Sequence, residues 1–230
     1  MDCFVALLLA LTSDMSRTCG RYRVTSVQVS GSEGYAEEAE ELFRLYERIP
    51  AADAHRAVLH LIPTSPGRIL DVGSGTGRDA AWFASMGHRV VAVEPTDAMR
   101  IPAMALHPSP QIEWLNDSLP DLALLRTRRE RFDLVMLSAV WMHLDQQQRR
   151  LAMPNLAALV QPGGTVIMKI RHGPVPVGRR MFEVSPEETI ELAEMQALLA
   201  VLNLRTESSQ QANRAAGVTW INLAFVSARK

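Results

Sequence analysis

The chain has 230 residues, of which 47% are hydrophobic and 21% charged, and these proportions argue against a chain that is disordered throughout. Its 24 Lys and Arg residues against 25 Asp and Glu residues give a net charge of −1, whereas dedicated nucleic-acid-binding proteins usually carry an excess of positive charge. Cys3 and Cys19 cannot form a disulfide framework and have no Cys or His neighbours for a zinc site, so we expect a reduced, cytosolic protein.

Residues 1–33 are expected to form a poorly ordered or weakly packed extension. The apolar run from Cys3 to Leu11 is too short to cross a bilayer, which takes about 20 residues. A secretory signal would carry positive charge before this run, but here Arg17 and other basic residues follow it. An initiation site at Met15 and a degenerate membrane anchor are the alternative interpretations of this segment.

A helical pattern of apolar residues begins at Tyr35. It consists of Tyr35, Ala39, Leu42, Tyr46 and Ile49, with charged residues on the other faces. This spacing predicts an amphipathic helix that ends at Pro50, and a second helical stretch follows over Ala51–Ile62. Residues 34–62 are therefore expected to form a helical unit whose apolar stripe must be buried against another part of the protein.

From Arg68 onward, short apolar strands alternate with helical segments. The expected strands are Arg68–Val72, Arg89–Glu94, Gln111–Leu115, Phe132–Ser138 and Thr165–Ile170. Such alternation is typical of βαβ units, in which helices cover both faces of a parallel sheet. We therefore expect residues 66–230 to form a single α/β core.

The C-terminal part departs from this alternation. Ser185–Glu188 is a capping box with Pro at the first helical position, and it predicts a helix that runs to about Leu202. Two strands follow, at about Asn203–Ser208 and Val218–Ala228, with only a polar loop between them. Because that connection is too short for a helical crossover, the last two strands should be antiparallel.

The strongest functional signal is the sequence DVGSGTG at Asp71–Gly77. A buried strand leads into three glycines at alternate positions, and a helix begins near Arg78. Glycines permit positive φ angles and a close approach of ligand to backbone, and the helix N-terminus adds free N–H groups. A dinucleotide-binding fold would need the pattern G-x-G-x-x-G, whose last position is occupied here by Arg78.

Two further acids follow the next strands. Glu94 ends the second strand, where a carboxylate can accept hydrogen bonds from both hydroxyl groups of a ribose. Asp117 follows the third strand and is either a ligand contact or a turn-forming residue. Thr96 is placed to cap the next helix, in which Met99 either packs in the core or lies against an adenine ring.

As a set, these motifs resemble those of the class I S-adenosylmethionine (SAM)-dependent methyltransferases, and the resemblance covers residues 66–171, including the Pro162-Gly163-Gly164 turn. It implies a Rossmann-like, doubly wound, mostly parallel seven-stranded sheet with an antiparallel last strand and additional N-terminal helices. It also implies SAM as the cofactor, with Asp117 accepting a hydrogen bond from the adenine amino group. The implied cofactor-binding residues are Asp71, Gly73, Ser74, Gly75, Gly77, Glu94, Pro95, Met99, Asp117, Ser118 and Ser138.

Catalytic groups are expected beyond the carboxyl ends of the strands. His143, after the fourth strand, is the best candidate for a general base, because histidine has an unperturbed pKa near neutrality. Alternatively, His143 braces the next helix, for which Asp145 and Gln148 form a capping box. The segment lacks the Asn/Asp-Pro-Pro-aromatic tetrad and the Pro-Cys pair of DNA methyltransferases, which counts against a nucleobase acceptor.

Basic residues after the fifth strand should border the acceptor pocket, where arginine side chains suit carboxylate or phosphate. We therefore expect an acidic small-molecule acceptor, although these arginines could instead pair with acids in a solvated loop. The helices of residues 34–62 are expected to cover the cofactor pocket, with Tyr46 or Phe43 reaching into it. The candidate substrate-binding residues are Tyr46, Trp141, Met142, Arg171, His172 and Arg180. The basic cluster over 126–131 should lie at the other end of the sheet, as a solvated loop or, less favoured, an RNA contact.

The sequence therefore predicts a SAM-dependent methyltransferase with a small-molecule acceptor and no metal, membrane or nucleic-acid partner. One alternative is an RNA or protein methyltransferase, against which the neutral charge and the absence of an added binding module argue. The others are a SAM-binding regulatory protein without catalysis and a nicotinamide-dependent oxidoreductase.

Overall fold

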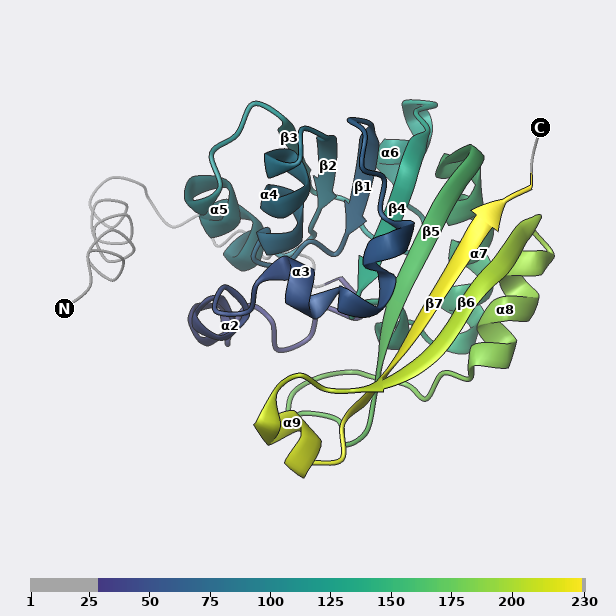
Figure 1. Cartoon of the computed structure of the whole chain (residues 1–230). Coiled ribbons are helices and arrows are strands. Elements are labelled where there is room, and N and C mark those ends of the chain that lie inside the picture. Colours follow the sequence, from purple (N-terminus) through teal and green to yellow (C-terminus); the bar gives the residue numbers. More distant parts are fainter. Residues whose placement is uncertain (1–28, 229–230) are drawn as a thin grey trace.

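A seven-stranded sheet forms the centre of the computed structural model, which describes residues 29–228 (Figure 1). Most of the predicted extension over residues 1–33 thus lies outside the described residues. The strand order is β3-β2-β1-β4-β5-β7-β6. The strands are β1 (Arg68–Val72), β2 (Arg89–Val93), β3 (Ile112–Leu115), β4 (Phe132–Ser138), β5 (Val160–His172), β6 (Leu198–Glu207) and β7 (Thr219–Ser227).

The pairing of the strands confirms the predicted topology. Strands β1 to β5 pair in parallel, whereas β7 is antiparallel to both β5 and β6. Strand β1 lies between β2 and β4, so the strand order reverses at β1. In open parallel sheets the connections leave a crevice at such a reversal, at the carboxyl ends of the strands. The fold therefore creates a ligand-sized crevice next to the glycine-rich loop.

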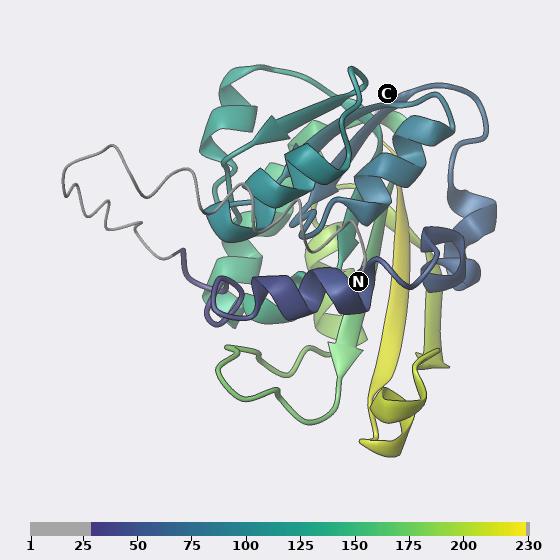
Figure 2. The ribbon, with the colours of Figure 1, turned by 90° about the vertical axis from the view of Figure 1, so that its left-hand side faces the viewer.

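Helices cover both faces of the sheet (Figures 1 and 2). One apolar cluster joins the sheet to α4 and η1, and the other joins it to α6, α7 and α8. Because both faces are covered, the inner strands β1 and β4 are buried over most of their length rather than at alternate residues. The helices are α2 (Ala39–Tyr46), α3 (Ala51–Ala54), α4 (Arg78–Ser85), α5 (Asp97–Leu106), α6 (Ala123–Thr127), α7 (Gln146–Leu159), α8 (Pro186–Glu194), α9 (Gln211–Ala215) and the 3₁₀ helices η1 (Arg56–Leu61) and η2 (Trp141–His143).

The N-terminal helix α2 lies beside the crevice rather than on a face of the sheet (Figure 2). Leu42 and Phe43 form its buried stripe, and they pack against Met99 and Ala103 of α5. Phe43 is thereby used for packing, whereas Tyr46 lines the cavity described below. The apolar face of α2 that the sequence predicts therefore packs against α5, next to the glycine-rich loop.

Two predicted boundaries and one predicted loop in the C-terminal half were wrong. Helix α8 ends at Glu194 rather than near Leu202, because Leu198–Glu207 pairs with β7 and tertiary pairing overrides the helical pattern. Strand β5 begins at Val160 instead of Thr165, so Pro162–Gly164 forms a register irregularity within the strand rather than a turn before it. The supposed polar loop after β6 contains the short helix α9. None of the helices described within residues 29–228 has the length and apolar character needed to cross a membrane.

Candidate functional site

A cavity of about 420 Å³ opens at the carboxyl ends of the central strands. Asp71 near the end of β1, Glu94 after β2 and Asp117 after β3 all line it, so the three acids predicted to converge do so. Ser74, Pro95, Met99, Ser118 and Ser138, which the sequence predicts to bind the cofactor, also line this cavity. Its other walls include the start of α4, η2, the ends of β5 and β7, the loops after β5 and β6, and the segment from Val29 through α2.

The three glycines of the glycine-rich loop have different surroundings, so each position favours glycine for a different reason. Gly73 has a φ of +69°, and a Cβ atom there would lie 2.5 Å from Val140 Cγ2, so only glycine fits. Gly75 has a φ of +55°, and within 4 Å of a Cβ atom placed there the described residues beyond its chain neighbours contribute only Met99 Cε, at 4.0 Å. Its open side faces the cavity, which leaves room for a ligand against the backbone.

Gly77 does not line the cavity, which corrects its predicted role in cofactor binding. Its φ is +83°, and a Cβ atom there would lie 2.5 Å from the Trp114 ring and 3.0 Å from His107. Gly77 is therefore required where the start of α4 packs against Trp114 of β3 and His107 at the end of α5. The motif pattern alone could not separate this packing role from a ligand contact, because both need the same residue.

Glu94 ties the loop to the next helix. Its carboxylate accepts hydrogen bonds from the backbone N–H groups of Gly75, at 3.0 Å, and Thr96, at 2.9 Å. Burial raises the pKa of Glu94, and these hydrogen bonds oppose that shift by favouring the charged form. Each carboxylate oxygen keeps a second acceptor position, so two hydroxyl groups of a ligand could still bind it.

Asp117 is a turn-forming residue that also lines the cavity, and its contact with a ligand stays a prediction. One of its oxygens accepts the N–H of Ser118 and the other that of Leu125 in α6, both at 2.9 Å. Met99 packs in the core, fully buried in the cluster under α2, and also lines the cavity. Its contact with an adenine ring likewise stays a prediction.

Asp71 differs from the other two acids because its Oδ2 atom is buried and has no hydrogen-bond partner among residues 29–228. Burial raises the pKa of Asp71 well above its usual value, and the nearby Asp79 carboxylate raises it further. Burial would also raise the pKa of Asp79, but His55, at 2.6 Å, and Arg78 hold it well below its usual value. The cavity thus contains one strongly paired acid and one acid with an oxygen that none of the described residues donates to.

His143 in η2 also lines this cavity. Its Nδ1 lies 2.7 Å from the carbonyl oxygen of Arg180, which can only accept, so Nδ1 carries the proton. Its Nε2 is then free to accept the hydroxyl hydrogen of Tyr35, at 2.9 Å. Burial lowers the pKa of His143, which favours this neutral form, and burial raises the pKa of Tyr35, which keeps the phenol protonated.

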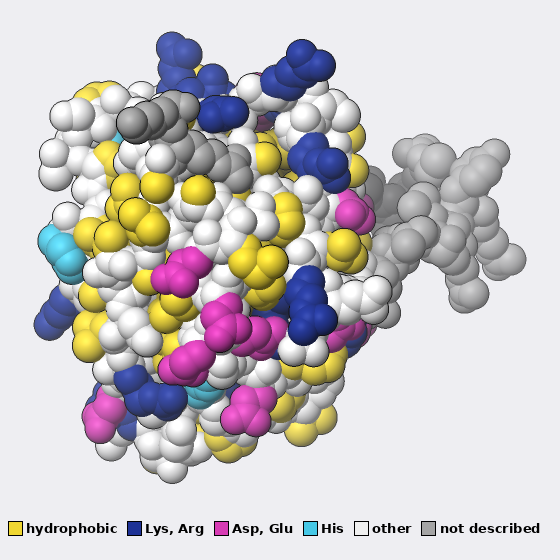
Figure 3. Space-filling model, turned by 90° about the vertical axis from the view of Figure 1, so that its right-hand side faces the viewer, with side chains coloured by type: hydrophobic (Ala, Val, Ile, Leu, Met, Phe, Trp, Pro, Cys, Tyr) yellow, Lys and Arg dark blue, Asp and Glu magenta, His cyan; other side chains and the backbone are white. Residues whose placement is uncertain are grey.

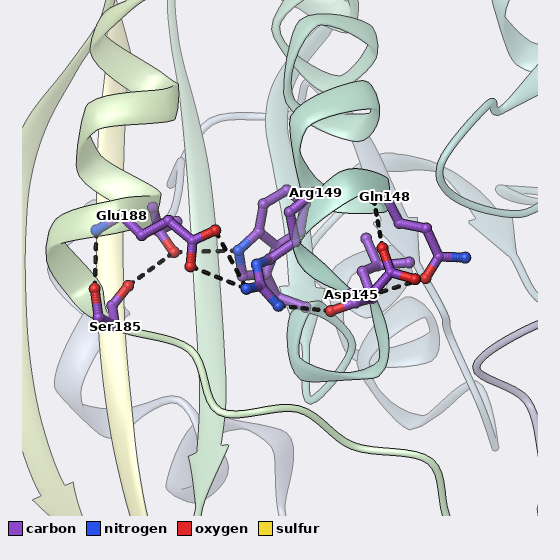
Figure 4. A network of polar contacts seen from close by, with 8 residues as sticks. Asp145, Gln148, Arg149, Ser185 and Glu188 are labelled. Carbon is purple, nitrogen blue, oxygen red and sulfur yellow. Dashed lines mark hydrogen bonds and ion pairs between the residues drawn. The ribbon is translucent and has the colours of Figure 1, made fainter.

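A polar network follows η2 at the start of α7 (Figure 4). Asp145 and Gln148 form the predicted capping box at the start of α7. Arg149 is almost fully buried, donates to the carbonyl oxygen of Leu144 at 2.6 Å, and pairs with Glu188 of α8 at 2.9 Å. The capping box is therefore confirmed, whereas the described side-chain hydrogen bonds of His143 are with Tyr35 and Arg180 rather than with α7.

Three predicted substrate residues lie outside the cavity, and each is corrected by the direction of its side chain. Trp141 is fully buried and donates its indole N–H to Thr189 of α8 at 3.2 Å, so it belongs to the core. His172 follows Arg171 on β5, and successive residues of a strand point to opposite faces, so only Arg171 faces the cavity. Arg180 does not line the cavity, and its side chain donates to Ser30 at the cavity edge and to Asp145. Tyr46, Met142 and Arg171 do line the cavity.

Several cavity residues had not been singled out from the sequence. Arg179, rather than its neighbour Arg180, lines the cavity, and its guanidinium lies 4.0 Å from the centre of the Tyr35 ring. It also pairs with Glu38 at 2.7 Å. Lys169 on β5 was detectable as a charge within an otherwise apolar strand. Trp220, opposite Arg171 on β7, had no signal that separates it from a core residue.

A second groove, of about 660 Å³, lies between α7 and α8, away from the strand ends. Glu187, Glu188 and Glu191 line it, and acidic side chains gather on this side of the molecule (Figure 3). Glu188 is taken up by Arg149 of the network described above. This groove has no counterpart to the glycine-rich loop, so the cavity at the strand ends is the candidate functional site.

Comparison with known proteins gives one match to a family model, that of a methyltransferase domain, over residues 69–164. An uncharacterized methyltransferase of Mycobacterium tuberculosis is 32% identical over 126 residues, which cover 52% of this chain and 46% of that protein. Glycine N-methyltransferase of Mus musculus is 29% identical over 135 residues, covering 50% and 46% respectively. The chain thus spans about half the length of the curated relatives it matches.

A similar solved structure is the 1,6-didemethyltoxoflavin-N1-methyltransferase of Burkholderia thailandensis, with bound 1,6-didemethyltoxoflavin and S-adenosylhomocysteine. It has a TM-score of 0.64 and 18% sequence identity, and the match covers 100% of this chain and 92% of that chain. At this identity the likeness shows the fold, and it agrees with the strand order described above.

The unpartnered carboxylate of Asp71 predicts an unusual pH dependence of stability. Because its pKa is raised on folding, the folded protein binds a proton more readily than the unfolded chain, and the stability contributed by Asp71 rises as pH falls. Asp71→Asn should therefore stabilise the ligand-free protein by about 1–3 kcal/mol near pH 8, with a smaller gain near pH 5. Urea unfolding at both pH values measures the difference.

The matched control is Asp121→Asn, which changes an exposed carboxylate. Its free energy of unfolding should stay within about 0.5 kcal/mol of that of the unchanged protein. An Asp71→Asn protein that is less stable than the unchanged protein at both pH values would show that this carboxylate is satisfied in the fold.

Proposed function

We propose that the chain, whose residues 69–164 match the family model of a methyltransferase domain, is a cytosolic class I SAM-dependent enzyme that transfers a methyl group from SAM to a small-molecule acceptor. The observation that carries the proposal is the convergence of Asp71, Glu94 and Asp117 with the open side of Gly75 on one cavity. RNA and protein acceptors are less favoured, because the chain has a net charge of −1.

The chemistry of the cavity fits SAM better than a nicotinamide dinucleotide. SAM has a sulfonium and an ammonium group, whereas a dinucleotide brings two negatively charged phosphates. Asp71, Glu94 and Asp117 line the cavity at the ends of three neighbouring strands, and a ligand phosphate at short range from them in a partly buried site would be repelled strongly. The buried Oδ2 atom of Asp71 lacks a donor, which an ammonium group would supply.

The proposed roles of the acids follow from their positions. Glu94 uses its remaining acceptor positions for the ribose hydroxyl groups, and Asp117 accepts a hydrogen bond from the adenine amino group. The backbone of Gly73 and Gly75 lies along the methionyl part. Bound SAM would supply a methyl group on a positively charged sulfur, and the sulfide that remains is a good leaving group. The chain therefore mainly has to align the acceptor and exclude water.

Tyr35 and His143 provide a route for a proton released by the acceptor. The phenol of Tyr35 donates to the unprotonated Nε2 of His143 at 2.9 Å. Tyr35 therefore accepts a proton from the acceptor while its own proton moves to Nε2. The carbonyl oxygen of Arg180 holds the ring of His143 in the tautomer that this transfer needs.

An acidic acceptor is supported by the cationic side of the cavity. Arg171 faces the cavity from β5, and its only described side-chain hydrogen bond is to the carbonyl oxygen of Pro174, at 2.7 Å. Its guanidinium has further N–H groups that suit a carboxylate. The mouse relative acts on glycine, which combines a carboxylate with an amine. We therefore favour a small acceptor that bears a carboxylate and a group that loses a proton on methylation.

Cofactor binding is the first test. Isothermal titration calorimetry should detect binding of SAM and none of NAD, and Glu94→Gln should weaken SAM binding by about tenfold or more, because a charged acceptor is lost. Glu113→Gln on β3 is the matched control, since Glu113 lies outside the cavity and pairs with Arg128. Methyl-labelled SAM incubated with small-metabolite extracts then identifies the acceptor. Binding of NAD but not SAM would refute the proposal.

The proton route predicts that His143→Gln and Tyr35→Phe each lower kcat for the labelled acceptor by about 10²-fold or more. In the unchanged enzyme, the acid limb of kcat/KM should lie below the usual pKa range of histidine, because burial lowers the pKa of His143. That limb should disappear in His143→Gln. His172→Gln, on the opposite face of β5, should leave the profile as it is. A kcat unchanged in both variants would exclude the route.

The acceptor site predicts that Arg171→Ala raises the KM for the acceptor by about 10–100-fold, since a charge-assisted contact is lost. The affinity for SAM should change little. Arg180→Ala is the matched control, because Arg180 does not line the cavity and its side chain pairs with Asp145, which lies outside it. Equal KM values in the two variants would remove the assignment of an anionic acceptor group to Arg171.

A further inference from the structure

Lys169 and Arg171 give one face of β5 two positive charges, of which the function proposed so far uses only the second. Both residues line the cavity, and because they are two positions apart on a strand, their side chains point to the same face. Their Cα atoms are thus about 7 Å apart. Trp220, the partner of Arg171 on β7, shares that face, and its ring centre lies 4.7 Å from the Nζ atom of Lys169. The two cations therefore share one aromatic neighbour.

Neither of these cations forms an ion pair with a carboxylate among the residues that the structure describes. Lys169 donates to the carbonyl oxygen of Ala54 at 2.5 Å, and Arg171 donates to that of Pro174 at 2.7 Å. A carbonyl oxygen carries no net charge, and both side chains keep further N–H donors. Positive charge that is partly withdrawn from water without an anion is costly unless a ligand completes it.

The other cationic side chains at the cavity are already neutralised. Four Lys and Arg residues within 29–228 line the cavity, and the two that lie outside β5 are Arg78 and Arg179. Arg78 pairs with Asp79 at 2.7 Å, and Arg179 pairs with Glu38 at 2.7 Å. The unmatched positive charge of the described cavity is therefore confined to the two cations of β5.

This pair of cations lies apart from the three acids assigned to SAM. Those acids are at the ends of β1, β2 and β3, whereas β4 separates β1 from β5 in the sheet. Two strand spacings, about 10 Å, therefore lie between β1 and β5. Burial lowers the pKa of Arg171, and the nearby phenols of Tyr46 and Tyr35 raise it. The pair thus borders the phenol of Tyr35, to which the acceptor is proposed to give its proton.

We propose that Lys169 and Arg171 form a paired cationic subsite for an acceptor that carries two negative charges close together, as a dicarboxylate or a phosphate monoester does. The inference rests on the proposed function and deepens it, because it assigns a second anionic charge to the acceptor. A single carboxylate would neutralise Arg171 and leave Lys169 unmatched. Two charge-assisted hydrogen bonds of about 2.8 Å, with the anionic group between them, can span the distance between the two side chains.

Lys169 is positioned for such a contact by its neighbours. Its ammonium group contacts the Ala54 carbonyl and the Trp220 ring, which limits the positions open to it. Burial lowers the pKa of Lys169 to about 8, and the nearby Asp79 carboxylate opposes this shift. A bound dianion would stabilise the charged form further. The second charge of the acceptor thus meets a cation whose place is already defined.

Small anions of different charge test the subsite before the acceptor is known. The probes are malonate, inorganic phosphate and, as a singly charged comparison, acetate. Each is titrated at constant ionic strength and near neutral pH into protein saturated with S-adenosylhomocysteine. Binding is followed by the NMR signal of the Trp220 indole N–H, which is identified by its absence from Trp220→Phe. Malonate, phosphate or both should bind about tenfold more tightly than acetate, because two charge-assisted contacts replace one.

Variants of one cation separate its role from that of the other. Lys169→Met should weaken binding of the doubly charged probes by about tenfold or more and leave the affinity for acetate unchanged, since acetate needs only Arg171. Lys169→Arg keeps the charge and should retain the affinity for all three probes. Arg126→Ala is the matched control, because it removes an exposed positive charge outside the cavity, and it should change none of these affinities.

The two doubly charged probes also distinguish the sources of the charge. Tighter binding of malonate would identify a dicarboxylate acceptor, and tighter binding of phosphate would identify a phosphate monoester. The inference would be overturned if neither dianion bound more tightly than acetate, or if Lys169→Met bound the dianions as well as the unchanged protein does.

The bound cofactor product provides the last distinction. Dianion binding that S-adenosylhomocysteine abolishes would also overturn the inference, because the anions would then occupy the place of the cofactor. A protein that fails to bind S-adenosylhomocysteine would contradict the proposed function. Binding of the dianions to that ligand-free protein, if it depended on Lys169, would still show the paired cationic subsite.

Discussion

Negative charge held at the ends of three neighbouring strands is the feature around which the rest of this site is arranged. Glu94 and Asp117 are each stabilised by two backbone N–H groups, which come from the loops and helices that follow the strands. Asp71 lacks such compensation at Oδ2. A buried carboxylate oxygen without a donor lowers the stability of the folded protein. A cationic ligand bound next to it would remove this penalty. Function and stability are therefore opposed at this position.

The other side of the cavity is built by segments far apart in the chain. The stretch before α2 contributes Tyr35, which contacts both His143 of η2 and Arg179 of the loop after β5. These contacts are close, since a Cβ atom on Gly34 would lie 2.5 Å from the Arg179 guanidinium. The N-terminal segment thus connects the proton-handling group with the basic loop. Its packing determines how well the cavity excludes water, on which alignment of an acceptor depends.

Packing away from the cavity supports this arrangement. The ion pair between Arg149 and Glu188 joins α7 to α8. Trp141 of η2 also donates a hydrogen bond to Thr189 of α8, so η2 is attached to the same helix. A buried ion pair of this kind adds more to the definition of one geometry than to net stability, because desolvation offsets most of its attraction. The ring of His143 consequently keeps one orientation, with its protonated nitrogen toward the carbonyl of Arg180.

The amino-acid sequence alone determined the alternating α/β topology, the antiparallel end of the sheet, the glycine-rich loop and the three acids, because these depend on short-range patterns and on the rule that parallel strands end at one edge. It could not separate Gly77 from Gly73 or Gly75, nor Arg179 from Arg180, since side-chain direction in loops follows from packing against distant segments. Trp141 reads as a pocket wall and is a core residue for the same reason. Only the tertiary structure brought Tyr35 to His143, because this hydrogen bond joins residues 108 positions apart in the chain.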